Sequence, residues 1–245
     1  MKTPLFFTFV CVVGIAFFVI SPLYPNQFAV QFLGSLAFWL GLGYLLMKYP
    51  LKNAISRVRS GGRTSFGVLI LYLMAHYLAY SLLLSRLTDL PVEKTLGLTY
   101  APMSTVDLQN LLGILFSPSL SAGWGGIYVD LSLFSILMGL VIGTLVTANL
   151  EELKYLRGAK REASLIGIPM AGIITGSTCC VSIATVVYYY VPLISLSLAV
   201  ASILLNFTYF SLPIITAIFL WLNLRTLMGF HGKIVKKNPE VKVDK

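Results

Sequence analysis

The chain has 245 residues, of which 57% are hydrophobic and only 11% are charged, and its formal net charge is +9. A water-soluble domain of this size carries far more charge on its surface, so the composition excludes a soluble globular protein and predicts an integral membrane protein. The basic balance does not indicate nucleic-acid binding, because the Lys and Arg residues cluster beside the ends of apolar segments, where membrane proteins carry positive charge.

Six apolar segments are long enough to cross a membrane as helices, which takes about 20 residues for a hydrocarbon core of about 30 Å. The strands of a membrane barrel would alternate apolar and polar residues, whereas these segments are apolar on all sides. In chain order the predicted spans are 4–22, 28–48, 65–85, 127–149, 164–190 and 196–222. The predicted fold is therefore all-α: a single transmembrane domain over residues 1–245, built as a polytopic bundle of six transmembrane helices.

The segment between the third and fourth spans, residues 86–126, is the one long connection outside the membrane. Ser104 and Asp107 have the spacing of a capping box and precede apolar residues at helical spacing from Leu108 to Phe116. That run is too short to span, so we expect a short interfacial or re-entrant helix within an external loop. The loop either covers an outward-facing vestibule or serves only as a connector with an interfacial anchor.

The fifth predicted span is unusually long, since a helix over 164–190 would extend about 40 Å at a rise of about 1.5 Å per residue. It contains Pro169 and a Gly-x-x-x-Gly pattern from Gly172 to Gly176, so we expect a tilted, kinked or broken helix. Broken helices with small residues at mid-depth form the binding sites of many transporters. Tilted helices that only pack against their neighbours have the same composition.

The distribution of positive charge predicts the orientation. With the N-terminus in the cytoplasm, 16 of the 18 Lys and Arg residues lie on the cytoplasmic side, and only Arg86 and Lys94 lie outside. Glu151 and Glu152 count with the cytoplasmic loop after the fourth span, and the two sides then carry +11 and −2. We predict a multi-pass protein of the cell membrane, N-in/C-in, with both termini cytoplasmic.

The C-terminal residues 223–245 form a basic cytoplasmic tail. Lysines close to a membrane surface are attracted to anionic lipid headgroups. The expected partners are therefore the lipid bilayer and those headgroups, and not nucleic acid.

The centres of the predicted spans hold no Asp, Glu, Lys or Arg, which argues against a carrier that shuttles protons on a buried carboxylate. Soft and polar residues gather there instead. Candidate metal ligands are Cys179, Cys180, Cys11 and His76, and candidate substrate-pathway residues are Asn206, Ser177, Thr178, Met74 and Met138.

These residue types favour a soft ion such as Cu(I), because thiolate, thioether and imidazole groups are its preferred ligands. Ordinary packing of Cys and Met as hydrophobes, or thiol redox chemistry, would explain the same residues. Neighbouring side chains on a helix point about 100° apart, so Cys179 and Cys180 reach one ion only if the helix is interrupted or if Cys11 supplies the second sulfur.

The leading functional hypothesis is passage of a small solute, a soft metal ion or a sulfur-containing species, through a mid-membrane site on spans five and six. Copper is the candidate ion. The alternative is a non-catalytic structural or assembly subunit of a larger membrane complex, whose partners are other membrane subunits or further copies of the chain. An enzyme is less favoured, because Ser177 lacks a Gly-x-Ser-x-Gly motif and an activating neighbour.

Overall fold

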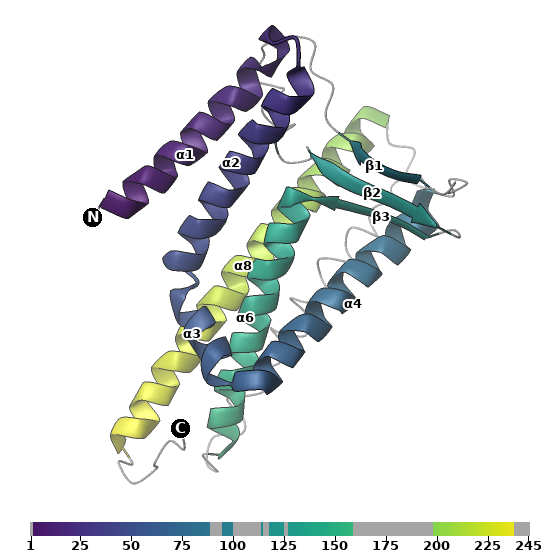
Figure 1. Ribbon diagram of the computed structural model, residues 1–245. Helices are drawn as coiled ribbons and strands as arrows, with labels where there is room; N and C mark the ends of the chain where they lie inside the picture. Colours follow the sequence, from purple (N-terminus) through teal and green to yellow (C-terminus); the bar gives the residue numbers. More distant parts are fainter. Residues whose placement is uncertain are drawn as a thin grey trace. The chain divides into compact units, whose positions relative to one another are not determined.

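The computed structural model describes residues 2–88, 95–99, 114, 118–124, 127–158 and 198–237. Within these residues the chain is mainly helical (Figure 1). The elements in chain order are α1 (Lys2–Ile20), the 3-10 helix η1 (Ser21–Leu23), α2 (Gln27–Lys48), α3 (Lys52–Ser60), α4 (Gly62–Thr88), β1 (Thr95–Thr99), β2 (Ser119–Trp124), β3 (Ile127–Ser132), α6 (Leu133–Gly158) and α8 (Leu198–Lys237).

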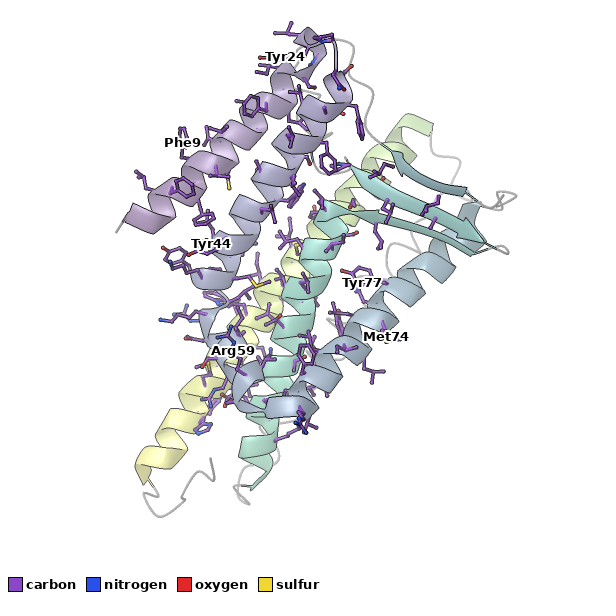
Figure 2. The ribbon with its side chains drawn as sticks, viewed as in Figure 1. Phe9, Tyr24, Tyr44, Arg59, Met74 and Tyr77 are labelled. Carbon is purple, nitrogen blue, oxygen red and sulfur yellow. The ribbon has the colours of Figure 1, made fainter. Side chains whose placement is uncertain are left out.

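Several of these helices are suited to a membrane. Among the described residues, four stretches are long and apolar enough to cross one: Pro4–Leu23, Gln27–Lys48, Leu133–Lys154 and Pro213–Gly232. Large apolar side chains such as Phe9 on α1 and Phe219 on α8 are exposed, and Figure 2 shows Phe9 on the outer side of its helix. Hydrocarbon solvates such side chains well, so the expectation of a mainly helical chain with several membrane-length apolar helices is confirmed.

The described chain divides into two compact units. The first comprises Met1–Lys52 and His76–Leu140, and the second comprises Asn53–Ala75 and Val141–Lys245. Because α4 and α6 each cross this division, each helix contributes one part to each unit.

In the first unit, α1 and α2 form a closely packed helical hairpin (Figure 1). A Cβ atom added at Gly14 would lie 2.6 Å from the Gly34 carbonyl oxygen, and one added at Gly34 would lie 2.7 Å from the Phe18 nitrogen. Small residues at such positions allow two backbones to approach, as in many membrane helix pairs. Near the other end of the pair, the rings of Phe7 and Tyr44 stack with their centroids 3.7 Å apart. Glycine therefore sets the spacing of this hairpin.

The first unit also contains a three-stranded antiparallel sheet in the order β1-β2-β3. Thr99 pairs with Ser119, and Trp124 pairs with Ile127. The two residues between that last pair are Gly-Gly in the sequence, a composition typical of two-residue hairpin connections. The sheet differs from the sequence prediction, in which a loop ended at residue 126 and the fourth span began at residue 127.

Ile114 belongs to the predicted external loop and packs on the α1–α2 hairpin. Its side chain is buried against Phe18, and its carbonyl oxygen accepts a hydrogen bond of 3.1 Å from Nε1 of the buried Trp39. Ile114 itself is helical, but the rest of the short helix predicted over Leu108 to Phe116 lies outside the described residues.

The second unit is built from nearly all of α3, parts of α4 and α6, and the whole of α8. Gly62, with φ of +65°, makes the turn between α3 and α4 in the left-handed region that favours glycine. The apolar core of the unit includes Ile142 and Leu145 of α6 and a stripe on α8, namely Leu220, Leu224 and Leu227. The i, i+4, i+7 spacing of that stripe is typical of a helix that buries one face.

The helix bounds refine the predicted spans. α1 overlaps most of the predicted span 4–22, α2 includes 28–48, and α4 includes 65–85. The predicted span 127–149 begins as strand β3, and α6 continues from Leu133 to Gly158. The predicted span 164–190 lies outside the described residues, and α8 includes nearly all of the predicted span 196–222 but continues to Lys237.

Candidate functional site

The second unit contains a row of polar side chains on α6 that are buried rather than exposed: Thr144, Thr147, Asn149, Glu151 and Glu152. Helical periodicity divides them between two faces. Gly143, Thr147 and Glu151 follow one another at four-residue spacing and lie toward α4, since a Cβ added at Gly143 would meet Leu69 and Tyr72. Asn149 and Glu152 lie on the other face. A helix predicted from its apolar composition thus carries polar groups along its buried length.

Glu152 is the most enclosed charge among the described residues, with none of its surface exposed. Its Oε1 forms an ion pair with Nε of Arg57 on α3, and its Oε2 lies 3.0 Å from Nδ1 of His231 on α8. A buried carboxylate is tolerated when such partners compensate its lost hydration. Glu152 therefore connects three helices through one charged group.

Glu151 has a different set of partners. Its Oε1 accepts a hydrogen bond of 2.6 Å from the hydroxyl of Ser65 on α4 and lies 2.6 Å from Nζ of Lys154. The Lys154 side chain is 54% exposed, so this ion pair is partly open to its surroundings, whereas the Ser65 contact is buried. Glu151 and Glu152 are adjacent in sequence, yet they connect α6 to different neighbours.

A neutral polar contact lies one turn before the glutamates. The Asn149 amide nitrogen donates to the carbonyl oxygens of Leu145, at 2.7 Å, and Leu220, at 3.1 Å. The Asn149 side-chain oxygen accepts a hydrogen bond of 2.9 Å from Asn223. Side-chain amides commonly connect membrane helices in this way, because hydrocarbon offers them no other partner. Together with the Glu152–His231 contact, Asn149 fixes α6 against α8 at two successive levels.

Gly61 makes room for the charged cluster. A Cβ added there would lie 1.8 Å from the Ser65 hydroxyl oxygen and 2.7 Å from the Glu151 carboxyl carbon. No side chain fits at this position without moving one of those groups. The turn between α3 and α4 therefore places Arg57 and Ser65 against the two glutamates.

The cluster pairs its acidic side chains with basic ones. Its two carboxylates face two permanently basic partners, Arg57 and Lys154, so these four charges cancel. Within the part of the chain that the structure describes, no group of three or more His, Cys, Asp and Glu side chains could hold a metal ion.

The sequence prediction treated Glu151 and Glu152 as charges of a cytoplasmic loop, whereas both are buried on α6. Charge counting places residues on one side of a membrane and says nothing about whether a helix continues past its apolar core. The signal in the sequence is the helical spacing of Thr144, Thr147 and Glu151, which indicates one polar face that continues into the charged segment.

Of the predicted metal ligands, Cys11 is buried in the α1–α2 hairpin. Its thiol donates to the Phe38 carbonyl oxygen at 3.6 Å, and a Cβ added at Gly41 would lie 2.7 Å from its sulfur. These contacts place the thiol inside the hairpin, and its role as a metal ligand stays a prediction.

His76 and Met138 both belong to the first unit. His76 is half-buried, its ring lies edge-on to Tyr77 with centroids 5.4 Å apart, and a Cβ added at Gly139 would lie 3.3 Å from its Cδ2. Met138 is buried on α6. The neighbouring Tyr77 donates a hydrogen bond of 3.1 Å to the Ile136 carbonyl oxygen. His76 therefore lies where α4 passes closely over a glycine of α6.

The other predicted site residues are spread more widely. Met74 is 57% exposed, and Figure 2 shows it pointing outward from α4. Asn206 lies on α8, where only the helix is described. The predicted residues Cys179, Cys180, Ser177 and Thr178 lie outside the described residues. Their role as ligands or pathway residues stays a prediction.

Comparison of the chain with protein-family models, with curated proteins and with solved structures found no match.

Proposed function

We propose that the chain is a cell-membrane protein with six spans and both termini in the cytoplasm, and that it moves a small solute across the membrane. The asymmetric distribution of Lys and Arg supports this orientation, since only Arg86 and Lys94 fall on the opposite side. In this proposal the helices α1, α2, α4, α6 and α8 are assigned to five of the six spans, and residues 164–190 are the fifth span.

The observation that carries the proposal is the row of buried polar and charged groups on α6. In the proposed topology the two glutamates lie just past the cytoplasmic end of the fourth span, and ionisable side chains that face the interior of a membrane bundle often mark a path for ions or substrates. Glu152 is completely buried although α6 is otherwise apolar enough to span. A helix that only held the bundle together would be more stable with apolar residues in that position.

The proposed solute is a soft metal ion or a sulfur-containing species, with Cu(I) as the first candidate. Cys179 and Cys180 are the proposed ligands, since thiolates select soft ions. Asn206 is expected near the same depth, because it is about as far after the turn between spans five and six as Cys179 is before it. In this proposal the ion is held transiently at mid-membrane and leaves past the polar face of α6.

A second candidate is a non-catalytic subunit of a membrane complex, and the packing of Cys11 favours it. That thiol donates to the Phe38 carbonyl oxygen within the α1–α2 contact, as a structural residue would. The exposed apolar faces of α1 and α8 would then contact other subunits instead of lipid.

Gentle detergent extraction under reducing conditions tests the two candidates together. The assembly mass and the bound metals of the purified chain are measured for wild type and for Cys179→Ser/Cys180→Ser. Passage of a soft ion predicts about one copper per chain in the wild type and none in the double variant, with equal expression. Cys11→Ser is the matched control, and it should retain the metal.

Two results would contradict the proposal. If the double variant bound as much metal as the wild type, Cys179 and Cys180 would not be the ligands. A metal-free chain that always purifies with other subunits, at a mass well above 26.9 kDa, would instead support the structural role.

A further inference from the structure

The three-stranded sheet of the first unit has one apolar face. The register places Leu98 opposite Leu120 and Leu120 opposite Leu131, so these three leucines form a row across β1, β2 and β3. Successive residues of a strand point to opposite faces, so Leu96 and Ala122 lie on the same face as the row. β3 alternates apolar and polar residues along its sequence, and Leu131 sets the phase of that alternation. The described side chains on this face are therefore all apolar.

The leucines of this face are exposed, whereas serines of the opposite face are buried. Leu96, Leu98 and Leu120 are 80%, 54% and 44% exposed. On the opposite face, Ser119 and Ser132 are only 6% and 4% exposed. An antiparallel sheet that packs one face on its own core and leaves the other in water shows the reverse arrangement, with leucine inside and serine outside. The leucines therefore need a partner other than water.

The sheet is joined directly to a helix of membrane length. β3 ends at Ser132 and α6 begins at the next residue, where the stretch Leu133–Lys154 that could cross a membrane also begins. The Ser132 side-chain oxygen accepts a hydrogen bond of 3.1 Å from the Ser135 backbone nitrogen, as a helix-capping residue does. A strand rises about 3.3 Å per residue, so Leu131 lies within about 7 Å, along the chain, of the start of α6. If α6 spans the membrane, the leucine row lies close to the membrane surface.

The surface of a bilayer fits this sheet better than the bilayer interior. The sheet is open, with β1 and β3 at its edges. The unpaired backbone groups of an open edge are not tolerated in hydrocarbon, so the whole sheet cannot be immersed. Amphipathic elements at the membrane surface instead bury their apolar face by about 5–10 Å and keep their polar groups hydrated. Because the described side chains of this face carry no charge, the matching chemistry is that of acyl chains and not of anionic headgroups.

We propose that the apolar face of the sheet binds lipid acyl chains at the membrane surface where α6 enters the bilayer. This leucine face comprises Leu96, Leu98, Leu120, Ala122 and Leu131. The sheet lies flat on the membrane and holds the start of α6 at a fixed depth. In the proposed topology this is the outer surface. The contact requires that α6 spans the membrane, and it holds whichever solute is moved.

A fluorescent label read by two quenchers tests this lipid contact. In the full chain, with its three native cysteines replaced by serine, Leu98→Cys or Leu120→Cys carries the label. Gly97→Cys is the matched control, because Gly97 lies on the opposite face and has nothing within 4 Å of an added Cβ. Each labelled chain is incorporated into phosphatidylcholine vesicles. One quencher is a lipid spin-labelled near the headgroup end of its acyl chain, and the other is iodide in the water on both sides.

We expect the spin-labelled lipid to quench Leu98→Cys and Leu120→Cys, and iodide to quench Gly97→Cys, so the preferred quencher reverses between adjacent residues. Equal quenching by iodide at positions 97 and 98 would place the leucine face in water and overturn the proposal. Protection of the leucine positions from both quenchers would also overturn it, because a second copy or another segment of the chain would then cover the face. Leu96→Cys gives the same readout if either leucine variant fails to fold.

Discussion

The carboxylate of Glu152 has one partner on α3 and another on α8, and this pairing makes a buried charge tolerable. Glu151, the next residue toward the N-terminus, has a half-exposed lysine and a serine instead. Two adjacent residues of the same type therefore differ in how much they contribute to stability. The difference arises from the helices they face and not from their chemistry.

Truncation of each glutamate tests this contrast. Glu152→Ala leaves Arg57 and His231 without their shared partner, so we expect a loss of about 3–5 kcal/mol in the free energy of unfolding. Glu151→Ala breaks an ion pair that is partly exposed, so its loss should be smaller, about 1–2 kcal/mol. Denaturant unfolding in mixed micelles measures both. If both variants lost the same free energy of unfolding, the difference in burial between the two ion pairs would be contradicted.

Two glycines near the start of α4 should respond to alanine in opposite directions. Gly61→Ala places a methyl group against Ser65 and Glu151, so we expect destabilisation by about 1–3 kcal/mol. Gly67 lies inside α4 with nothing within 4 Å of an added Cβ, and Gly67→Ala should stabilise the helix by about 0.5–1 kcal/mol. Thermal unfolding of the two variants provides the comparison. If both variants were stabilised, or both destabilised, the described geometry of the cluster would be contradicted.

At the scale of elements, the α1–α2 hairpin shows how closely two helices approach when glycine lines their contact. Gly14 and Gly34 bring backbone against backbone, and Gly41 accommodates the Cys11 sulfur. Because a membrane provides little hydrophobic force between helices, such close packing is a main source of their association.

A bulky residue at Gly34 should separate this hairpin. The leucine side chain of Gly34→Leu would collide with the backbone of Phe18 and Gly14, which cannot move aside as a flexible side chain can. We therefore expect the free energy of unfolding to fall by about 3 kcal/mol or more. The same change at Gly229 of α8, where nothing lies within 4 Å, is the matched control. Disulfide formation between cysteines introduced at Phe7 and Tyr44, whose rings stack across the hairpin, would measure whether the two helices stay together. Its persistence in Gly34→Leu would refute the role of glycine.

At the scale of the whole molecule, the parts that sequence predicts well are the long apolar helices. α1 and α2 follow from length and composition, since few other structures bury so many apolar residues in one run. The sheet of β1, β2 and β3 was missed for two reasons: β1 and β2 are short and rich in Ser, Gly and Thr, and the apolar residues of β3 were counted as the start of the fourth span. The Gly-Gly pair after Trp124 was a usable signal.

The buried cluster was harder to predict for a different reason. Whether Glu152 is exposed depends on the approach of Arg57 and His231, which are 95 and 79 residues away along the chain. Spacing along one helix shows which side chains share a face, but not which neighbour covers that face. Candidate residues at a common depth, such as Cys11 and Met138, carry no information about rotation around their helices.

Labelling with a membrane-impermeant thiol reagent tests the proposed orientation. In a chain whose three native cysteines are serine, Lys94→Cys should react in intact cells, because it lies in the external loop of the proposal. Lys245→Cys should react only after the cells are made permeable, because the basic tail is cytoplasmic. Labelling of both positions in intact cells would contradict the placement of the loop and the tail on opposite sides of the membrane.

Transport of Cu(I) into sealed lipid vesicles is the most direct test of solute passage. The purified chain is incorporated alone into vesicles that enclose a copper indicator, and entry is compared with that into protein-free vesicles. The proposed function predicts faster entry with the wild-type chain and no excess entry with Cys179→Ser/Cys180→Ser, while Cys11→Ser retains transport. Entry with the wild-type chain no faster than into protein-free vesicles, at matched protein content and sidedness, would contradict it.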